Sequence, residues 1–416
     1  MEQNGYQYSE NLPPKKEDGH KFIKGALLGA LLVCLVIAAG TALGFVKIGP
    51  KVQGVSSVAG GEQVVDDATE TKLELIQALI DRYYLHDIDK DAQKEYLYLG
   101  YVAGLGDQYS TYYDEEETKQ LMEDTEGTFS GIGATMTLEE STGLVEVVNV
   151  YPDSPAEKGG LKDGDKIYQV DGEDIVGLDL SEVVAKIKGE KGTDVSLSVY
   201  RGDDMEEKEL TFTRDTIEKA TVEYEMKENH VGYLKITEFD DVTYDQYVNA
   251  MDDLENQGME RLIIDLRSNP GGNVSTVCDI LKTLLPKGMI VYTEDKNGEK
   301  TEYKNDEDHT FDKPLVVLVN GNSASASEIF TGAVQDYGLA TIVGTQTYGK
   351  GVVQQLIDLQ DGTCLKLTVS QYYTPKGRSI NGVGIEPDEI VEYEENKEDP
   401  NADNQLDRAM EIVQQK

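Results

Sequence analysis

Residues 315–337 have the sequence LVVLVNGNSASASEIFTGAVQDY, and this stretch decides the fold. Its first five residues, Leu315 to Val319, are all apolar, which is typical of a strand covered on both faces of a sheet. Small and polar residues follow from Asn322 to Ser327, and we expect a helix from there to Tyr337. A buried strand that leads directly into a helix indicates an α/β sheet.

The same alternation continues on both sides of this stretch, from about residue 222 to residue 343. Helices are predicted at Tyr244–Asn256 and Thr276–Leu285. The strands that alternate with them are predicted at Val231–Ile236, Arg261–Leu266 and Ala340–Val343. Strands of this kind require helices on both faces of the sheet, so residues 215–392 are predicted to form an α/β core domain.

Residues 127–214 have a different sequence pattern, which predicts short strands separated by turns. Ser154 followed by Pro155 is typical of a helix N-terminus, and Ser181 is expected to cap a second short helix that ends at Lys188. Val145 and Val147 lie on one side of an alternating strand. About 85 residues of this pattern predict a separate β-rich module.

The remaining regions are helical. Residues 66–126 predict a small helical cap or an oligomer contact, with helices from Asp66, at about Asp91–Ala103 and at Glu115–Met122. Residues 393–416 are an acidic tail with one amphipathic helix around Leu406–Val413. A length of 416 residues agrees with two or three domains, so the fold class is α/β within an α+β multidomain chain.

The composition excludes several classes of function. Lys and Arg total 38 and Asp and Glu total 79, so the net charge is 38 − 79 = −41, which argues against nucleic-acid binding. The three cysteines, Cys34, Cys278 and Cys364, are too few for a disulfide framework, and the sequence leaves open whether the last two pair. The four histidines are scattered, so we expect no metal site, no histidine triad and no cofactor.

Residues 25–46 carry no charge, and a helix of these 22 residues is about 33 Å long, enough to span a bilayer. Lys15, Lys16, Lys21 and Lys24 precede it, so the positive-inside rule places residues 1–24 in the cytoplasm and the rest of the chain outside. Residues 47–65 then form a stalk. The alternative is a cleaved signal peptide with a small-residue site around residues 38–42, but the long positively charged start favours an uncleaved anchor.

Three segments at strand ends of the core carry possible chemistry. Residues 322–329 place serines at a helix N-terminus, which suits a nucleophile beside an oxyanion, although such serines also serve simply as caps. Lys350 lies between two glycines; burial would make its amine a general base, whereas exposure would make it an ordinary turn residue. Gln354, four residues on, would share its face in a strand. The glycine pair Gly271 and Gly272 is either a ligand-binding edge or an ordinary turn.

These segments resemble those of the carboxyl-terminal processing proteases, also called tail-specific proteases. The motifs are DLRSNPGG at 265–272, SASASE at 323–328 and TYGKGVVQ at 347–354, together with GDQYS at 106–110 and YTPKGRSI at 373–380. The resemblance covers residues 66–392 in the expected order. It implies a Ser–Lys peptidase without a cofactor, one of the variants of the serine triad.

The resemblance also implies a role for each matching residue. Ser325 would be the nucleophile, Lys350 the general base and Gln354 its supporting residue. Backbone N–H groups of Ala326, Gly271 and Gly272 would form the oxyanion hole, and Glu328 and Asp336 would have supporting roles.

The module at 127–214 resembles a PDZ domain. Its Gly131, Ile132 and Gly133 would hold the terminal carboxylate of a peptide that adds to the next strand, unless the module is a spacer without a ligand. Together these features predict a single-pass, membrane-anchored serine endopeptidase of the bacterial envelope that binds and cleaves unstructured protein C-termini. The rival hypothesis is a non-catalytic tail-binding adaptor. Relatives also suggest a homodimer through residues 66–125.

Overall fold

The computed structural model describes residues 64–139, 141–202, 204–308, 310–396, 399 and 402–415. The chain divides into two compact units, one ending at Ile88 and one beginning at Asp89. Among the described residues, no helix combines the length and the apolar character needed to cross a bilayer. The predicted cytoplasmic tail (1–24), the predicted anchor (25–46) and most of the predicted stalk lie outside the described residues.

The first unit contains helix α2 (Asp67–Tyr83), which confirms the helix predicted from Asp66. The Asp66 carboxylate accepts a hydrogen bond from the Thr69 N–H at 2.8 Å and caps the helix. None of the residues of α2 is buried, and Ile76 and Leu79 are among its exposed apolar side chains.

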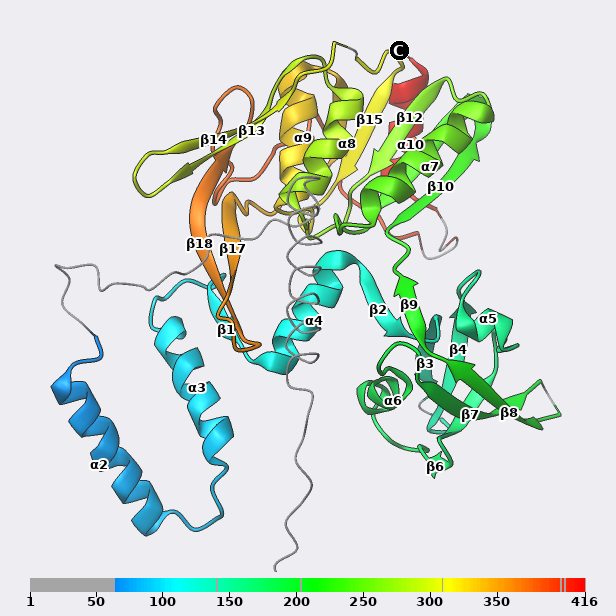
Figure 1. Ribbon diagram of the computed structural model, residues 1–416. Coiled ribbons are helices and arrows are strands. Elements are labelled where there is room, and N and C mark those ends of the chain that lie inside the picture. The colour runs from blue at the N-terminus through cyan, green and yellow to red at the C-terminus, as the bar shows by residue number, and fades with distance from the viewer. Residues whose placement is uncertain are drawn as a thin grey trace, which may run out of the picture. The chain divides into compact units, whose positions relative to one another are not determined.

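The second unit contains a six-stranded sheet (Figure 1). Its strand order is β10 (Val222–Lys227), β11 (Val231–Ile236), β12 (Arg261–Asp265), β15 (Leu315–Val319), β16 (Ala340–Gly344) and β19 (Glu389–Ile390). β10 pairs antiparallel with β11, and all the other neighbours are parallel. All five residues of β15 are buried, so the apolar strand at 315–319 and the α/β class are confirmed.

Helices cover both faces of this sheet. α7 (Thr243–Asn256), α8 (Val274–Leu284) and α9 (Ala326–Tyr337) pack on the face that carries Leu262 and Val317. α10 (Asn404–Gln414) packs on the opposite face, where its Ala409 and Val413 meet Ile263 and Val316. The helix predicted near the C-terminus therefore exists, and it supplies the cover that the buried strands require (Figure 1).

A second, smaller sheet lies beside the parallel one. It contains β1 (Thr111–Tyr113), β18 (Cys364–Tyr373), β13 (Gly288–Asp295) and β14 (Lys300–Asn305), with β17 (Val352–Asp358) also paired to β18. β1 follows α3 (Lys90–Ala103) and precedes α4 (Glu115–Glu126), so the predicted helices of the cap are confirmed in the second unit. The pairing of β1 with β18 joins the helical region directly to the core.

The β-rich module is built on a sheet of order β3 (Ala134–Glu139), β4 (Leu144–Val150), β5 (Lys166–Val170), β7 (Asp194–Arg201) and β8 (Glu206–Thr213), with β6 (Glu173–Asp174) on β5. β2 (Thr128–Gly131) and β9 (Asp215–Glu218) pair where the chain enters and leaves it. Ser154 caps α5 (Pro155–Lys158) as predicted. The predicted cap of α6 (Leu180–Ile187) was wrong: the N-cap is Asp179 rather than Ser181, because the backbone is already helical at Leu180.

Candidate active site

Ser325 lies at the turn between β15 and α9. Its backbone has φ 55° and ψ −112°, a conformation that residues with a side chain rarely adopt and that costs roughly 1–3 kcal/mol. The Ser325 N–H donates to the Glu328 carboxylate at 2.9 Å, which holds the turn closed. The strained turn leaves Ser325 partly exposed while its neighbour Ala326 is fully buried.

The carboxylate of Glu328 joins the Ser325 turn to the loop that carries Lys350. Glu328 is fully buried, and its Oε2 accepts the N–H of both Ser325 and Lys350 at 2.9 Å. Its Oε1 accepts the Thr347 hydroxyl at 2.6 Å and the Gly349 N–H at 2.7 Å. Four donors on one buried carboxylate fix the relative position of the two loops.

Tyr372 of β18 joins the same two loops a second time. Its Oη lies 3.0 Å from the Ser325 carbonyl oxygen and 2.5 Å from the Lys350 carbonyl oxygen. Burial raises the pKa of Tyr372 well above its usual value, so its hydroxyl remains a donor. Tyr372 was not predicted from the sequence, because its contact with Ser325 joins positions that are 47 residues apart.

The amine of Lys350 is partly buried. Burial lowers the pKa of Lys350, the nearby positive charge of Lys366 lowers it further, and Glu328 opposes the shift. The Nζ lies over the ring of Tyr109, 4.9 Å from its centroid. Among the described residues no hydrogen bond joins Lys350 Nζ to Ser325 Oγ or to Gln354, so the link between the two loops runs through Glu328 and Tyr372.

Gln354 lies in β17, but the reasoning that placed it on the same face as Lys350 does not hold. Lys350 precedes the strand, and a register shift between Val353 and Gln354 breaks the alternation of side chains. The Gln354 Nε2 donates to the Thr368 hydroxyl of β18 at 3.2 Å.

The glycine pair at 271–272 lies against the Ser325 turn. A Cβ atom on Gly271 would stand 2.7 Å from the Ser325 Cβ and 2.9 Å from the Ala326 nitrogen, and its φ is +110°. The Gly271 N–H already donates to Asn269 Oδ1 at 2.8 Å. Within the described chain, the N–H groups of Gly272 and Ala326 donate to no other group, so these two remain available to an oxyanion.

Asn269 is the residue that positions this glycine pair, a role that was not predicted from the sequence. It is fully buried, and its Nδ2 donates to the Ile236 carbonyl at 2.9 Å. Its carbonyl oxygen accepts the Ala324 N–H and the Ser327 hydroxyl, each at 3.0 Å. The position of Asn269 within the motif at 265–272 was the sequence feature that could have indicated this role.

Asp336 supports a different loop. Its Oδ2 accepts the Lys376 N–H at 2.8 Å, and its Oδ1 pairs with Arg378 at 2.6 Å. These contacts hold the turn that follows β18 and give Asp336 a structural partner outside the Ser325–Lys350 pair.

Comparison with known proteins identifies the family. The model of peptidase family S41 matches residues 230–391, and the model of the PDZ domain matches residues 146–201. The chain is 36% identical over 358 residues to carboxy-terminal processing protease CtpA of Bacillus subtilis, an alignment that covers 86% of this chain and 75% of that protein. The chain belongs to the carboxy-terminal processing proteases. It is a serine-type peptidase with a PDZ domain.

Two further matches agree with this. Carboxy-terminal processing protease CtpB of Bacillus subtilis is 35% identical over 342 residues, covering 81% of this chain and 71% of that protein. A crystal structure titled as a putative S41 protease from Bacteroides fragilis aligns with a TM-score of 0.50 and 18% identity, over 86% of this chain and 99% of that chain. The latter likeness supports the fold alone.

A cavity lies in the PDZ domain of this carboxy-terminal processing protease, beside the loop that was proposed from sequence as a carboxylate site. This cavity of about 120 Å³ is lined by the predicted loop Gly131, Ile132 and Gly133 together with Met136, Val184 and Ile187. Within the described residues the Ile132 and Gly133 N–H groups donate to no other group. The amine of Lys188, at the end of α6, lies 5.2 Å from the centroid of the Phe129 ring, and both residues line the cavity.

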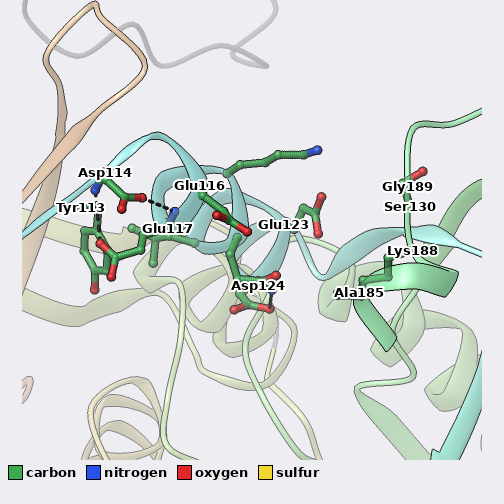
Figure 2. Close-up of a pocket in the computed structure, with 13 residues that line it drawn as sticks. Tyr113, Asp114, Glu116, Glu117, Glu123, Asp124, Ser130, Ala185, Lys188 and Gly189 are labelled. Atoms are coloured by element: carbon green, nitrogen blue, oxygen red, sulfur yellow. Dashed lines mark hydrogen bonds between the residues drawn. The ribbon is translucent and has the colours of Figure 1, made fainter. Parts of the chain in front are cut away.

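A larger cavity of about 710 Å³ lies between α4 and the end of α6. Figure 2 shows that carboxylates of α4, among them Glu116, Glu123 and Asp124, face it from one side. None of the predicted catalytic residues lines it. Its volume therefore gives no reason to move the candidate active site away from Ser325.

Proposed function

We propose that this protease is a membrane-anchored, extracytoplasmic endopeptidase that binds the free C-terminus of an unstructured protein and cleaves that protein with Ser325 as nucleophile and Lys350 as general base. The observation that carries the proposal is the buried Glu328 carboxylate, which accepts the N–H groups of both Ser325 and Lys350 at 2.9 Å. One rigid contact thus holds the two loops that supply nucleophile and base.

The mechanism begins with neutral Lys350. Its amine takes the proton of Ser325 Oγ as the oxygen attacks the scissile carbonyl carbon. The N–H groups of Ala326 and Gly272 donate to the oxyanion, Lys350 passes its proton to the leaving amine, and water then releases the acyl-enzyme. Gln354 supports the amine once Lys350 has turned toward Ser325. No step requires a cofactor.

The PDZ groove supports the proposed selection of C-terminal tails. The free N–H groups of Ile132 and Gly133 suit a terminal carboxylate, and Ile132, Val184 and Ile187 suit an apolar last side chain. β3 is the last strand of its sheet, so its outer edge is available for a peptide to add as a further strand. The predicted substrate is therefore a flexible protein chain that ends in an apolar residue with a free carboxylate.

Anchoring rests on the uncharged segment 25–46 and the lysines before it. We expect full-length protein in the membrane fraction of a bacterial host, with its PDZ and protease domains degraded by protease added outside the cytoplasmic membrane. Recovery of a soluble chain that lacks its first 46 residues would favour a cleaved signal peptide instead.

A homodimer is proposed on the evidence of the helical region. α3 has no buried residue, and Tyr96, Leu97 and Tyr101 on it are exposed. We expect a dimer in analytical ultracentrifugation and a monomer for Leu97→Glu. A monomeric parent at all concentrations would contradict the proposal.

Cleavage of a defined tail tests the function. Full-length parent, Ser325→Ala and Lys350→Ala are incubated with an unstructured protein that ends in an apolar residue, and with the same protein ending in an amide. We expect fragments from the parent alone, and far fewer from the amide, while Ser325→Ala still binds the tail. Binding without cleavage by every version would favour the adaptor hypothesis.

A further inference from the structure

The segment at residues 106–110 contacts the candidate base although it lies outside the matched peptidase region, residues 230–391. It contributes Tyr109, whose ring centroid is 4.9 Å from Lys350 Nζ. Lys350 and Tyr109 are 241 positions apart in the sequence.

Hydrogen bonds hold Tyr109 in this place. Asp107 accepts the Tyr109 N–H at 3.2 Å and the Ser110 hydroxyl at 2.5 Å. The Ser110 oxygen accepts the Thr368 N–H of β18 at 3.0 Å. Thr368 in turn accepts a hydrogen bond from Gln354, so one strand supports both the ring and the proposed supporting glutamine.

We propose that Tyr109 is a positioning residue for Lys350. The face of the Tyr109 ring holds the ammonium form of Lys350 in the resting site, and it releases the lysine amine toward Ser325 when that amine becomes neutral. The proposal rests on the proposed function of Lys350. A ring face attracts an ammonium group and has little attraction for a neutral amine. Loss of the proton therefore weakens this contact at the moment when the amine is needed as a base.

Other charged and titratable groups also face Lys350. Lys366 on β18 and burial lower the pKa of the amine, while Glu328 on α9 raises it. Burial raises the pKa of the Tyr109 phenol, and Tyr348, which lies in the same loop as Lys350, raises it further. Tyr372 contacts the Lys350 backbone carbonyl rather than the amine. The ring of Tyr109 is thus the aromatic group on the amine itself.

The test is the pH dependence of kcat for the full-length protein with a tail peptide. Tyr109→Leu keeps apolar cover but removes the ring face, so the ammonium form loses stabilisation and the rise of kcat moves to lower pH by about one unit. Tyr109→Phe retains the ring and keeps the parent's pH midpoint. The matched control is Tyr292→Leu, because Tyr292 places a ring 4.7 Å from the Nζ of Lys300, a lysine that does not contribute to the pKa shift of Lys350, and we expect the pH midpoint of kcat within roughly 0.3 unit of the parent.

A second measurement covers variants too slow to assay. The rate at which a fluorophosphonate labels Ser325 is followed against pH, since labelling also requires the neutral base. The role of the ring is overturned if Tyr109→Leu keeps the parent's pH midpoint. It is also overturned if the midpoint shifts as far in Tyr109→Phe as in Tyr109→Leu. Full activity of Ser325→Ala or Lys350→Ala would instead overturn the proposed function, so the two failures are distinct.

Discussion

At the scale of single residues, the site depends on a few buried polar groups that connect its loops. Ser325 and Lys350 could be proposed as catalytic residues from sequence, because each lies in a long motif that resembles those of the family. The four hydrogen bonds of Glu328 and the contact between Tyr109 and Lys350 were not, since each joins segments that only the folded chain brings together. Local patterns indicate where a strand ends but not which side chain arrives there from elsewhere.

Glu328→Gln tests the connection between the two loops. The amide would turn one nitrogen toward two donors, so we expect unfolding free energy to fall by about 2 kcal/mol and kcat to fall about 100-fold. Urea unfolding and steady-state kinetics measure the two effects. Glu260→Gln, an exposed carboxylate paired with Arg261 at 3.0 Å, is the control and should change stability by less than about 0.5 kcal/mol. Equal kinetics in both variants would refute the role of Glu328.

We expect the protonation state of Lys350 to set the pH dependence of kcat. Below its lowered pKa the amine is charged and cannot accept the Ser325 proton, so kcat should rise with pH and level off once the amine is neutral. Lys350→Arg should be inactive at every pH, because guanidinium stays charged. Asp240 also titrates in this range, because burial, followed by the nearby charge of Glu238, raises its pKa to about 7. The variant Asp240→Asn therefore shows which part of the dependence of kcat on pH comes from Asp240. A flat profile for the parent would contradict the assignment of Lys350.

At the scale of elements, the turn after β12 must lie against the start of α9. Continuous apolar runs made β12, β15 and α9 predictable from sequence to within a few residues at each end. β1 and β13 were not predicted, because both pair with β18, which lies 60 or more residues away along the chain. β14 pairs with the neighbouring β13 and was also not predicted. Pairing between distant strands leaves little local signal.

Gly271→Ala tests the approach of these two elements. The added methyl would clash with Ser325 and the Ala324 carbonyl, 2.7 and 2.8 Å away, at a φ of +110°. We expect kcat to fall about 100-fold or more. Gly338→Ala at the end of α9 is the control: its φ is also positive, but nothing lies within 4 Å, so it should cost about 1 kcal/mol of stability and leave kcat near that of the parent. If kcat fell equally in Gly271→Ala and Gly338→Ala, backbone strain rather than the clash with Ser325 would account for the loss.

At the scale of the whole molecule, the C-terminal helix completes the core. Its amphipathic pattern was predictable, but the sequence did not show which surface it covers. α10 buries Ala409 and Val413 against the second face of the sheet, and Asp403 pairs with Arg267 at 2.7 Å. Arg267 also pairs with Asp265 at the end of β12, so the helix is linked to the loop that carries the glycine pair.

Val413→Ala tests the contribution of this helix. Removing two buried methyl groups should lower unfolding free energy by about 2 kcal/mol while leaving the site chemistry in place. Glu411→Ala, on the exposed side of α10, should change stability by less than about 1 kcal/mol. Thermal unfolding of both variants compares them, and similar melting temperatures would mean that α10 does not stabilise the fold.

The central claim is that Ser325 is the nucleophile and Lys350 its base. Labelling of full-length protein with a fluorophosphonate, followed by peptide mass mapping over a series of pH values, tests it most directly. We predict one adduct, on Ser325, that forms faster as pH rises and is absent from Lys350→Ala. An adduct on Ser323 or Ser327, or labelling of Lys350→Ala at the parent's rate, would contradict the account.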